Sequence, residues 1–245
     1  MRPILVAGRG FEIWSYAAML YLGLIAGLMA ENLGAHVMNL AALQVFEATL
    51  ILLGPAILGA RLFYVGTHWP QYRLTPERIF RRGEGGLSMY GGLPVMLLSS
   101  LPILKIFRLH FGAFWDAATL AILAGIGFTK IGCLLHGCCA GRCSQSKFAI
   151  FLPDARGIWK KRIPVQVLEA AWAIVLLGAA WMVLKRLPFR GALFLGAAAW
   201  YGAGRMVLEN FREREAGLSS FAGGKIPSMV VAISATALLI LCWPQ

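Results

Sequence analysis

Residues 165–184 read VQVLEAAWAIVLLGAAWMVL, an apolar run that contains a single charged residue, Glu169. A helix needs about 20 such residues to cross the hydrocarbon core of a bilayer. Helices are the expected form because every backbone polar group must find a partner inside lipid. Further runs of this kind occupy residues 13–29, 38–60, 87–106, 114–132, 191–207 and 226–243. The sequence therefore predicts an all-α, polytopic membrane protein with about seven transmembrane helices.

The composition of the 245 residues supports this class. Hydrophobic residues make up 59% of the chain and charged residues 14%, whereas charged residues make up roughly 25% of a soluble domain. This composition excludes a soluble enzyme, a disordered chain, a coiled coil and a secreted disulfide scaffold. No internal repeat or low-complexity linker divides the sequence, so residues 1–245 are expected to form one domain.

The chain is strongly basic, with 23 Lys and Arg against 11 Asp and Glu. The basic residues fall in loops between apolar runs and no base-reading motif is present. An anionic phospholipid is therefore the expected partner, and nucleic acid is not. In a seven-span topology most of these residues lie on the side of the N-terminus. The positive-inside rule would put that side in the cytoplasm.

Two patterns place polar groups within apolar runs. Tyr201, Arg205 and Glu209 are spaced by four residues and share one face of a helix. They could form an ion pair at the membrane interface, or a guanidinium that Glu209 orients toward a phosphate. Gln166 and Glu169 also share a face, for which capping and interface polarity is the plain interpretation. Glu47, in the middle of its run, is expected to face the interior or to be protonated.

A glycine-rich segment, GEGGLSMYGGLP, occupies residues 83–94. Its glycines, Gly91 and Gly92 among them, would let a backbone or a lipid headgroup approach closely. Tyr90 within it could serve as an interfacial anchor or as a hydroxyl in a site.

Residues 130–143, KIGCLLHGCCAGRC, contain four of the five cysteines together with His136. Four interpretations remain open for Cys133, Cys138, Cys139 and Cys143. They could bind a soft metal, although the spacing is not a standard zinc pattern. One could be a nucleophile helped by His136, Lys130 or Arg142. They could form a disulfide, or could simply pack at a helix end.

Taken in order, these segments resemble the phosphatidylglycerol:prolipoprotein diacylglyceryl transferase family over most of the chain. The resemblance rests on a tyrosine in the first span, a glycine–arginine segment, the glycine-rich motif, the signature segment and two later motifs. The matching positions are Tyr16, Gly59–Tyr64 with Arg61, Gly85–Leu93, Gly132, Gly137, Gly141, Arg142, Pro164, Gln166, Glu169, Ala170, Tyr201, Arg205, Glu209, Phe211 and Arg212.

The centre of the family pattern is altered here. Tyr90 stands where the family usually has histidine, and Lys130 where it has arginine. Its two asparagines are replaced by Cys133 and His136, and its glutamate by Cys138. The histidine and tyrosine of a later motif become Ile163 and Leu168. An ammonium at position 130 can still meet a phosphate but cannot grip it in a bidentate manner. The chain is therefore identified as a divergent relative.

The resemblance implies an inner-membrane enzyme that moves diacylglyceryl from phosphatidylglycerol to the lipobox cysteine of a prolipoprotein, without a metal or other cofactor. It implies that Arg205 and Arg142 hold the headgroup phosphate, with Arg61 assisting. Glu209 and Tyr201 would orient Arg205, and Tyr90 would take the histidine's place near the reacting centre. His136, although it replaces a family asparagine, is the best candidate for the general base in the signature segment because of its imidazole. Further expected substrate contacts are Lys130, Gly91, Gly92, Gly141 and Gln166.

Two other hypotheses and one conflict remain. A paralogous enzyme could act on another acceptor through a covalent intermediate on Cys133, Cys138 or Cys139. A non-enzymatic membrane protein could bind or move a soft metal at the thiol cluster. The resemblance also puts the N-terminus and the active face outside the cell, whereas the positive-inside rule puts them in the cytoplasm. The two can be reconciled if the loop arginines bind lipid phosphate and do not determine the membrane orientation.

Overall fold

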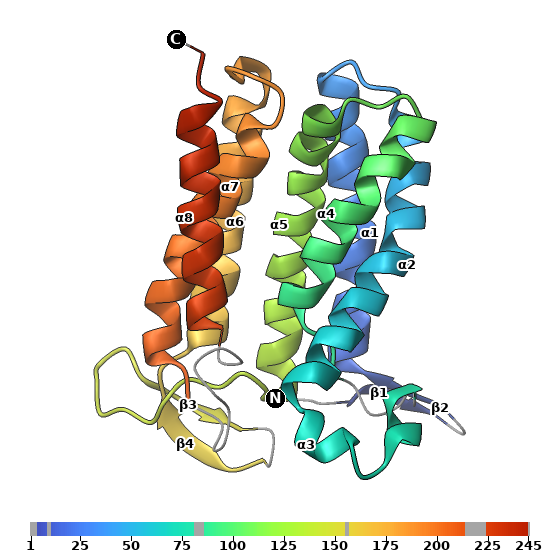
Figure 1. Cartoon of the computed structure of the whole chain (residues 1–245). Helices are drawn as coiled ribbons and strands as arrows, with labels where there is room; N and C mark the ends of the chain where they lie inside the picture. The colour runs from blue at the N-terminus through green and yellow to red at the C-terminus, as the bar shows by residue number, and fades with distance from the viewer. Residues whose placement is uncertain (1–3, 9–10, 81–85, 155–156, 214–223, 245) are drawn as a thin grey trace.

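The fold is a bundle of long helices closed at one end by two small hairpins (Figure 1). This computed structural model describes residues 4–8, 11–80, 86–154, 157–213 and 224–244. Residues 81–85 of the glycine-rich region lie outside them. The long helices are α1 (Ser15–Val37), α2 (Ala42–Thr67), α4 (Met89–Ile106), α5 (Phe111–His136), α6 (Val165–Val183), α7 (Ala192–Leu208) and α8 (Lys225–Leu241).

Five of these helices, α1, α2, α4, α5 and α6 with its 3-10 extension, are long and apolar enough to cross a membrane. The prediction of an all-α polytopic membrane protein is confirmed. Helices α7 and α8 have 17 residues each, so the count of seven spans stays a prediction. Helices α1 and α2 continue well past the predicted ends at 29 and 60, because the helical backbone extends beyond the apolar stretch that the prediction followed.

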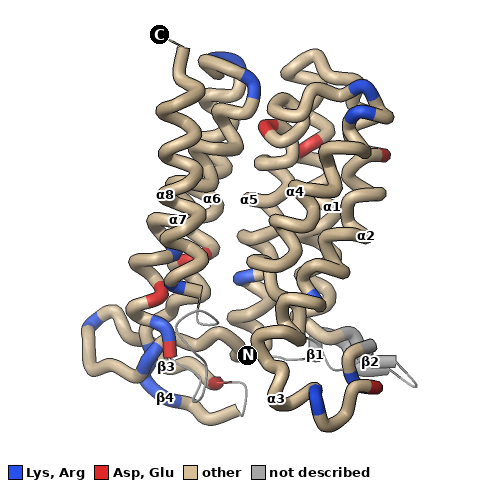
Figure 2. The backbone as a smooth tube through the Cα atoms, in the orientation of Figure 1, with Lys and Arg blue, Asp and Glu red and all other residues tan. Residues whose placement is uncertain are grey.

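The polar end of the bundle carries short elements between the helices. Two antiparallel hairpins lie there, β1 (Ile4–Gly8) with β2 (Phe11–Trp14) and β3 (Ile150–Pro153) with β4 (Trp159–Arg162). The short helix α3 (Trp69–Tyr72) and a 3-10 turn at Pro76–Phe80 follow α2. The N-terminus lies at this end and the C-terminus at the other (Figure 1). Charged residues gather toward the two ends of the helices (Figure 2).

Small residues let the helices approach closely. A Cβ added at Gly27 of α1 would lie 2.9 Å from the Ala121 carbonyl oxygen of α5. The same holds where α4 meets α2, since a Cβ at Gly91 would lie 2.4 Å from the Gly59 oxygen. Gly92, beside it, faces the Ala56 carbonyl. Gly91 and Gly92 of the glycine-rich motif are thus buried in a helix–helix contact.

Helix α5 connects the two groups of helices, α1, α2 and α4 on one side and α6, α7 and α8 on the other (Figure 1). Its buried Phe114 and Trp115 anchor the apolar core, and the Trp115 indole donates to Ser100 Oγ at 3.0 Å. The neighbouring Asp116 accepts the backbone N–H groups of Gly191 and Phe194 at 2.6 and 3.0 Å. It thereby caps the start of α7, which fixes that helix against α5.

The expectation that Glu47 faces the interior was wrong. Glu47 is exposed on α2, one position before the buried Ala48. The buried carboxylate in this part of the bundle is Glu31 of α1, which accepts a hydrogen bond from Thr49 Oγ1 at 2.9 Å. Which face of a helix is buried depends on its neighbours, and the apolar run around Glu47 has no clear polar face to indicate it.

Candidate active site

A buried carboxylate is the centre of the charged cluster between α5, α6 and α7. Glu169 of α6 is 2% exposed and contacts both Lys130 of α5 and Arg205 of α7 through short ion pairs. A buried carboxylate is stable only when it is paired and hydrogen-bonded. Here each carboxylate oxygen faces a different cation, so Glu169 holds two positive groups from two other helices side by side.

The charges continue from Arg205 toward the polar end of the bundle. Arg205 Nη2 lies 2.8 Å from Glu209, and Arg212 lies 3.8 Å from the same carboxylate. The ion pair expected from the four-residue spacing of Arg205 and Glu209 therefore forms. Among the described residues, Lys130, Arg205 and Arg212 face two carboxylates, Glu169 and Glu209, so this part of the cluster has a surplus of positive charge.

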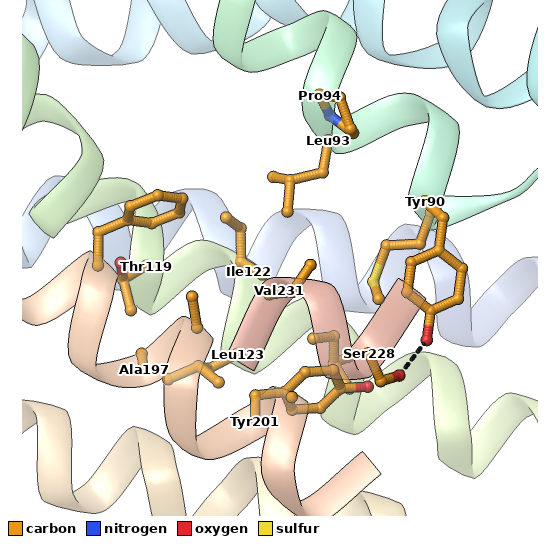
Figure 3. A pocket seen from close by; sticks show the side chains of 15 residues that line it. Tyr90, Leu93, Pro94, Thr119, Ile122, Leu123, Ala197, Tyr201, Ser228 and Val231 are labelled. Carbon is orange, nitrogen blue, oxygen red and sulfur yellow. Dashed lines mark hydrogen bonds between the residues drawn. The ribbon is translucent and has the colours of Figure 1, made fainter. Parts of the chain in front are cut away.

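Tyr90 approaches this cluster from α4. Its hydroxyl donates to the Gly224 carbonyl at 3.1 Å and lies 2.6 Å from Ser228 Oγ of α8 (Figure 3). Gly224 begins α8 with a φ of +87°, and a Cβ added there would lie 3.3 Å from the Tyr90 hydroxyl and 3.6 Å from Arg205 Nη2. The absence of a side chain at Gly224 thus leaves room between the tyrosine and the arginine.

An apolar pocket of about 100 Å³ opens beside these groups, between α4, α5, α7 and α8 (Figure 3). Its wall is mostly aliphatic and aromatic, with Leu93, Ile122 and Val231 among the lining residues. Its polar groups are the hydroxyls of Thr119, Ser228 and two tyrosines, Tyr90 and Tyr201. Tyr201 also lies within electrostatic range of Lys130, Glu169 and Arg205, so it joins the pocket to the ionic cluster.

The structure brings together three of the four cysteines of the signature segment. The sulfur atoms of Cys133, Cys138 and Cys139 all lie within 4.8 Å of one another. Arg212 donates to Cys139 Sγ at 2.9 Å. Hydrogen bonds from the other two thiols, and then the Arg212 guanidinium, lower the pKa of Cys139 below its ordinary value. Cys143 does not belong to this group, because it is exposed and pairs with Arg162 in an isolated β-bridge.

Three predicted site residues bind the backbone of the polar end. The Arg61 guanidinium donates to the carbonyl oxygens of Ile79, Arg78 and Gly86 at 2.8, 2.9 and 3.1 Å. Gly141 packs against Ile163, because a Cβ added at Gly141 would lie 2.0 Å from the Ile163 carbonyl oxygen. Gln166 is buried and donates to the Cys138 carbonyl at 2.9 Å, which ties α6 to the turn that carries the cysteines. These contacts are structural, and any substrate contact by these residues stays a prediction.

The other two predicted residues are His136, at the end of α5, and Arg142, in the loop that follows it. His136 is the last residue of α5 and packs edge-on against Tyr16 of α1, with ring centroids 6.2 Å apart. Its Nδ1 is buried without a hydrogen-bond partner among the described residues. Arg142 is exposed, and its guanidinium lies over the Phe211 ring at 5.5 Å.

Sequence reasoning missed the roles of two residues. For Glu169, capping and interface polarity is the plain interpretation of the sequence, whereas the structure puts its carboxylate between two buried cations. Arg162 belongs to the basic run Lys160-Lys161-Arg162, which lies between two apolar runs of the sequence. It is 1% exposed and lies 3.0 Å from Asp154 and 2.5 Å from Glu213. No sequence signal separates it from Lys160 and Lys161, because its burial depends on how the β3–β4 hairpin folds back.

These features define a multi-pass membrane protein with a buried, positively charged site beside an apolar pocket. Residues 3–241 match the model of the prolipoprotein diacylglyceryl transferase family, and the chain belongs to that family. The resemblance predicted from the sequence motifs is thereby confirmed.

The relatives cover most of the chain at modest identity. A protein of Geobacter sulfurreducens named phosphatidylglycerol–prolipoprotein diacylglyceryl transferase is 30% identical over 225 residues, which are 90% of this chain and 86% of the relative. Proteins with the same name match from Clostridium kluyveri, at 27% over 86% of this chain and 85% of the relative, and from Enterococcus faecalis, at 25% over 95% and 87%.

Glu169→Gln tests the ionic cluster. The substitution keeps the side-chain shape but leaves Lys130 and Arg205 side by side without their shared anion. Breaking a buried pair from one side costs about 3–5 kcal/mol, so the melting temperature of the purified protein in detergent should fall by roughly 10 °C. Glu47→Gln removes an exposed carboxylate from α2 and is the matched control, with an expected change below roughly 2 °C. Equal melting temperatures for the two variants would contradict the central position of Glu169.

Proposed function

We propose that this protein transfers diacylglyceryl from phosphatidylglycerol to the lipobox cysteine of a prolipoprotein, in the cytoplasmic (inner) membrane of a bacterium. The observation that supports the proposal is that an apolar pocket lies directly beside a cluster of buried cations. An apolar pocket suited to acyl chains ends at Tyr90 and Tyr201, beside the cations Lys130 and Arg205. A phospholipid has the same order of parts, apolar chains followed by an anionic phosphate.

The proposed reaction increases negative charge at the phosphate. The acceptor sulfur attacks the glyceryl carbon that carries the phosphate ester, a C–S bond forms and the C–O bond breaks. The phosphate leaves with its glycerol headgroup, and its formal charge rises from one to two negative units. Lys130 and Arg205 are the groups that would stabilise this charge, since cations fixed where charge develops lower the barrier most. Because Glu169 and Glu209 already hold the Arg205 guanidinium, little reorganisation is needed.

The thiol proton of the acceptor needs a base. His136 remains the proposed one, because a neutral imidazole can accept a proton and its buried Nδ1 has no partner among the described residues. Tyr90 is proposed to stand in for the family's histidine, with its hydroxyl held by Gly224 and Ser228. Arg142 is proposed to contact the headgroup from the exposed side of the site.

A covalent intermediate on Cys133, Cys138 or Cys139 does not suit this transfer. Attack by a cysteine of the enzyme on the glyceryl carbon would form a thioether, whose sulfur is a poor leaving group. The diacylglyceryl would remain on the enzyme. A cysteine nucleophile would therefore require a different transferred group, such as an acyl group carried as a thioester, for which nothing in the site provides a specific indication.

Arg205→Ala should reduce transfer by about 100-fold or more, because it removes a cation that acts on the developing charge. The assay incubates the purified protein with phosphatidylglycerol and a lipobox peptide, and measures the diacylglyceryl increment on the peptide by mass spectrometry. Arg186→Ala, which removes an exposed arginine at the opposite end of the bundle, is the control and should keep wild-type activity. Wild-type turnover by the Arg205→Ala variant would refute the proposal. An unmodified peptide with the wild-type chain, beside a working relative, would show that the acceptor or donor differs.

We also propose that the end of the bundle that carries the site faces the outside of the cell, as the resemblance to the family implies. Its basic residues would then bind lipid phosphate and would not determine the membrane orientation. The C-terminus lies at the opposite end of the bundle (Figure 1) and should then be cytoplasmic. A C-terminal green fluorescent protein fusion should fluoresce and a C-terminal alkaline phosphatase fusion should be inactive. An active phosphatase with a dark fluorescent fusion would mean that the positive-inside count gives the true orientation.

A further inference from the structure

Three thiols meet where α5 ends, next to the ionic cluster but without a part in the transfer proposed above. Cys133 lies in the last turn of α5 and is 4% exposed, whereas Cys138 and Cys139 follow the helix and are half-buried. All three sulfur atoms lie within 4.8 Å of one another.

The backbone is bent to bring these sulfurs together. Gly137 ends α5 with a φ of +86°, and Cys139 has a φ of +57°. A non-glycine residue in the left-handed region costs of order 1–3 kcal/mol and persists where the surroundings over-determine it, often at functional sites. The two left-handed residues reverse the chain, so that Cys138 and Cys139 return toward Cys133 on the helix.

The surroundings of the cluster are positively charged. Arg212 donates to Cys139 Sγ at 2.9 Å. Lys130 lies one helical turn before Cys133 and acts electrostatically on both Cys138 and Cys139. Three thiolates around a monovalent cation carry two negative charges in total. Lys130 and Arg212, although each also faces a carboxylate, would partly offset these charges.

We propose that Cys133, Cys138 and Cys139 form a three-thiolate binding site for a soft, monovalent metal ion, of which Cu(I) is the representative. Thiolate ligands select Cu(I) and Zn²⁺ among the common ions. Structural Zn²⁺ takes four ligands, and no fourth His, Cys, Asp or Glu joins this group among the described residues. Three sulfur atoms that each lie about 2.3 Å from one ion would be about 4.0 Å apart in a planar arrangement. The three sulfur atoms here already lie within 4.8 Å of one another.

The test is a competition for Cu(I). The purified, reduced full-length protein in detergent is titrated with Cu(I) in the presence of bicinchoninate, a chromophoric Cu(I) chelator. The wild-type chain should remove one equivalent from the chelator, and X-ray absorption of the complex should show three sulfur neighbours. Loss of a residue that only supports a metal ligand weakens metal binding by roughly 10–100-fold. Each of Cys133→Ser, Cys138→Ser and Cys139→Ser removes a ligand itself and should therefore weaken Cu(I) binding by more than this.

The chain provides a matched control. Cys143 and Cys242 are exposed and lie outside the cluster, so the Cys143→Ser/Cys242→Ser variant loses two thiols and should bind Cu(I) like the wild type. Thermal melting of each variant in the absence of metal confirms that it is folded. Since the readout is metal binding, the result is independent of whether the chain transfers diacylglyceryl.

Several outcomes would overturn the proposal. The wild-type chain could fail to compete for Cu(I), or the triple serine variant at positions 133, 138 and 139 could bind as well as the wild type. Tighter retention of Zn²⁺ than of Cu(I) would refute the monovalent assignment. A disulfide between two of the three cysteines, found by mass spectrometry before reduction, would refute the site if the reduced protein also bound no Cu(I).

Discussion

The contact of Glu169 with Lys130 and Arg205 is the interaction on which the rest of the site depends. Three helices, α5, α6 and α7, each contribute one charge to it, and none of these charges would be stable alone in an apolar bundle. The carboxylate serves the fold by joining the helices. It serves the site by holding two cations close together at a depth where they would otherwise repel each other. The surplus of positive charge and the apolar pocket beside it then define what can bind: an anion attached to an apolar chain.

Several of the alterations relative to the family pattern lie at or near this contact. Lys130 takes the place of an arginine but still reaches Glu169, so the charge is kept although the fork-like geometry is lost. Tyr90 takes the place of a histidine and is held by Gly224 and Ser228 at the end of the pocket. Cys133 and Cys138, in place of an asparagine and the glutamate, face each other and Cys139. The scaffold and the late arginine motif are retained, whereas the end of α5 and the turn after it carry a cluster of three thiols.

The sequence was sufficient for the helices, because an apolar run of about 20 residues has few alternatives in a bilayer. It was also sufficient for contacts within one helix, as with Arg205 and Glu209, where spacing alone determines the neighbours. It was insufficient where partners come from different helices. The burial of Glu169, the exposure of Glu47, the structural contacts of Arg61 and the separation of Cys143 from the other cysteines all depend on tertiary packing. The motif resemblance located the cluster's residues but gave no indication that Glu169 is its centre.

The most direct test of this account compares two lipids with the same acyl chains, phosphatidylglycerol and diacylglycerol, which lacks the phosphate. Their binding to the purified protein can be measured by native mass spectrometry for the wild-type chain and for a Lys130→Met/Glu169→Gln/Arg205→Met variant, in which Glu169 and both of its cations are removed together. Glu209, which also pairs with Arg205, keeps Arg212 as its partner in this variant. The account predicts that the wild-type chain prefers phosphatidylglycerol by at least about tenfold, equivalent to 1.4 kcal/mol, and that the variant binds both lipids alike. A preference that survives in the variant would contradict the claim that this buried cluster recognises the phosphate.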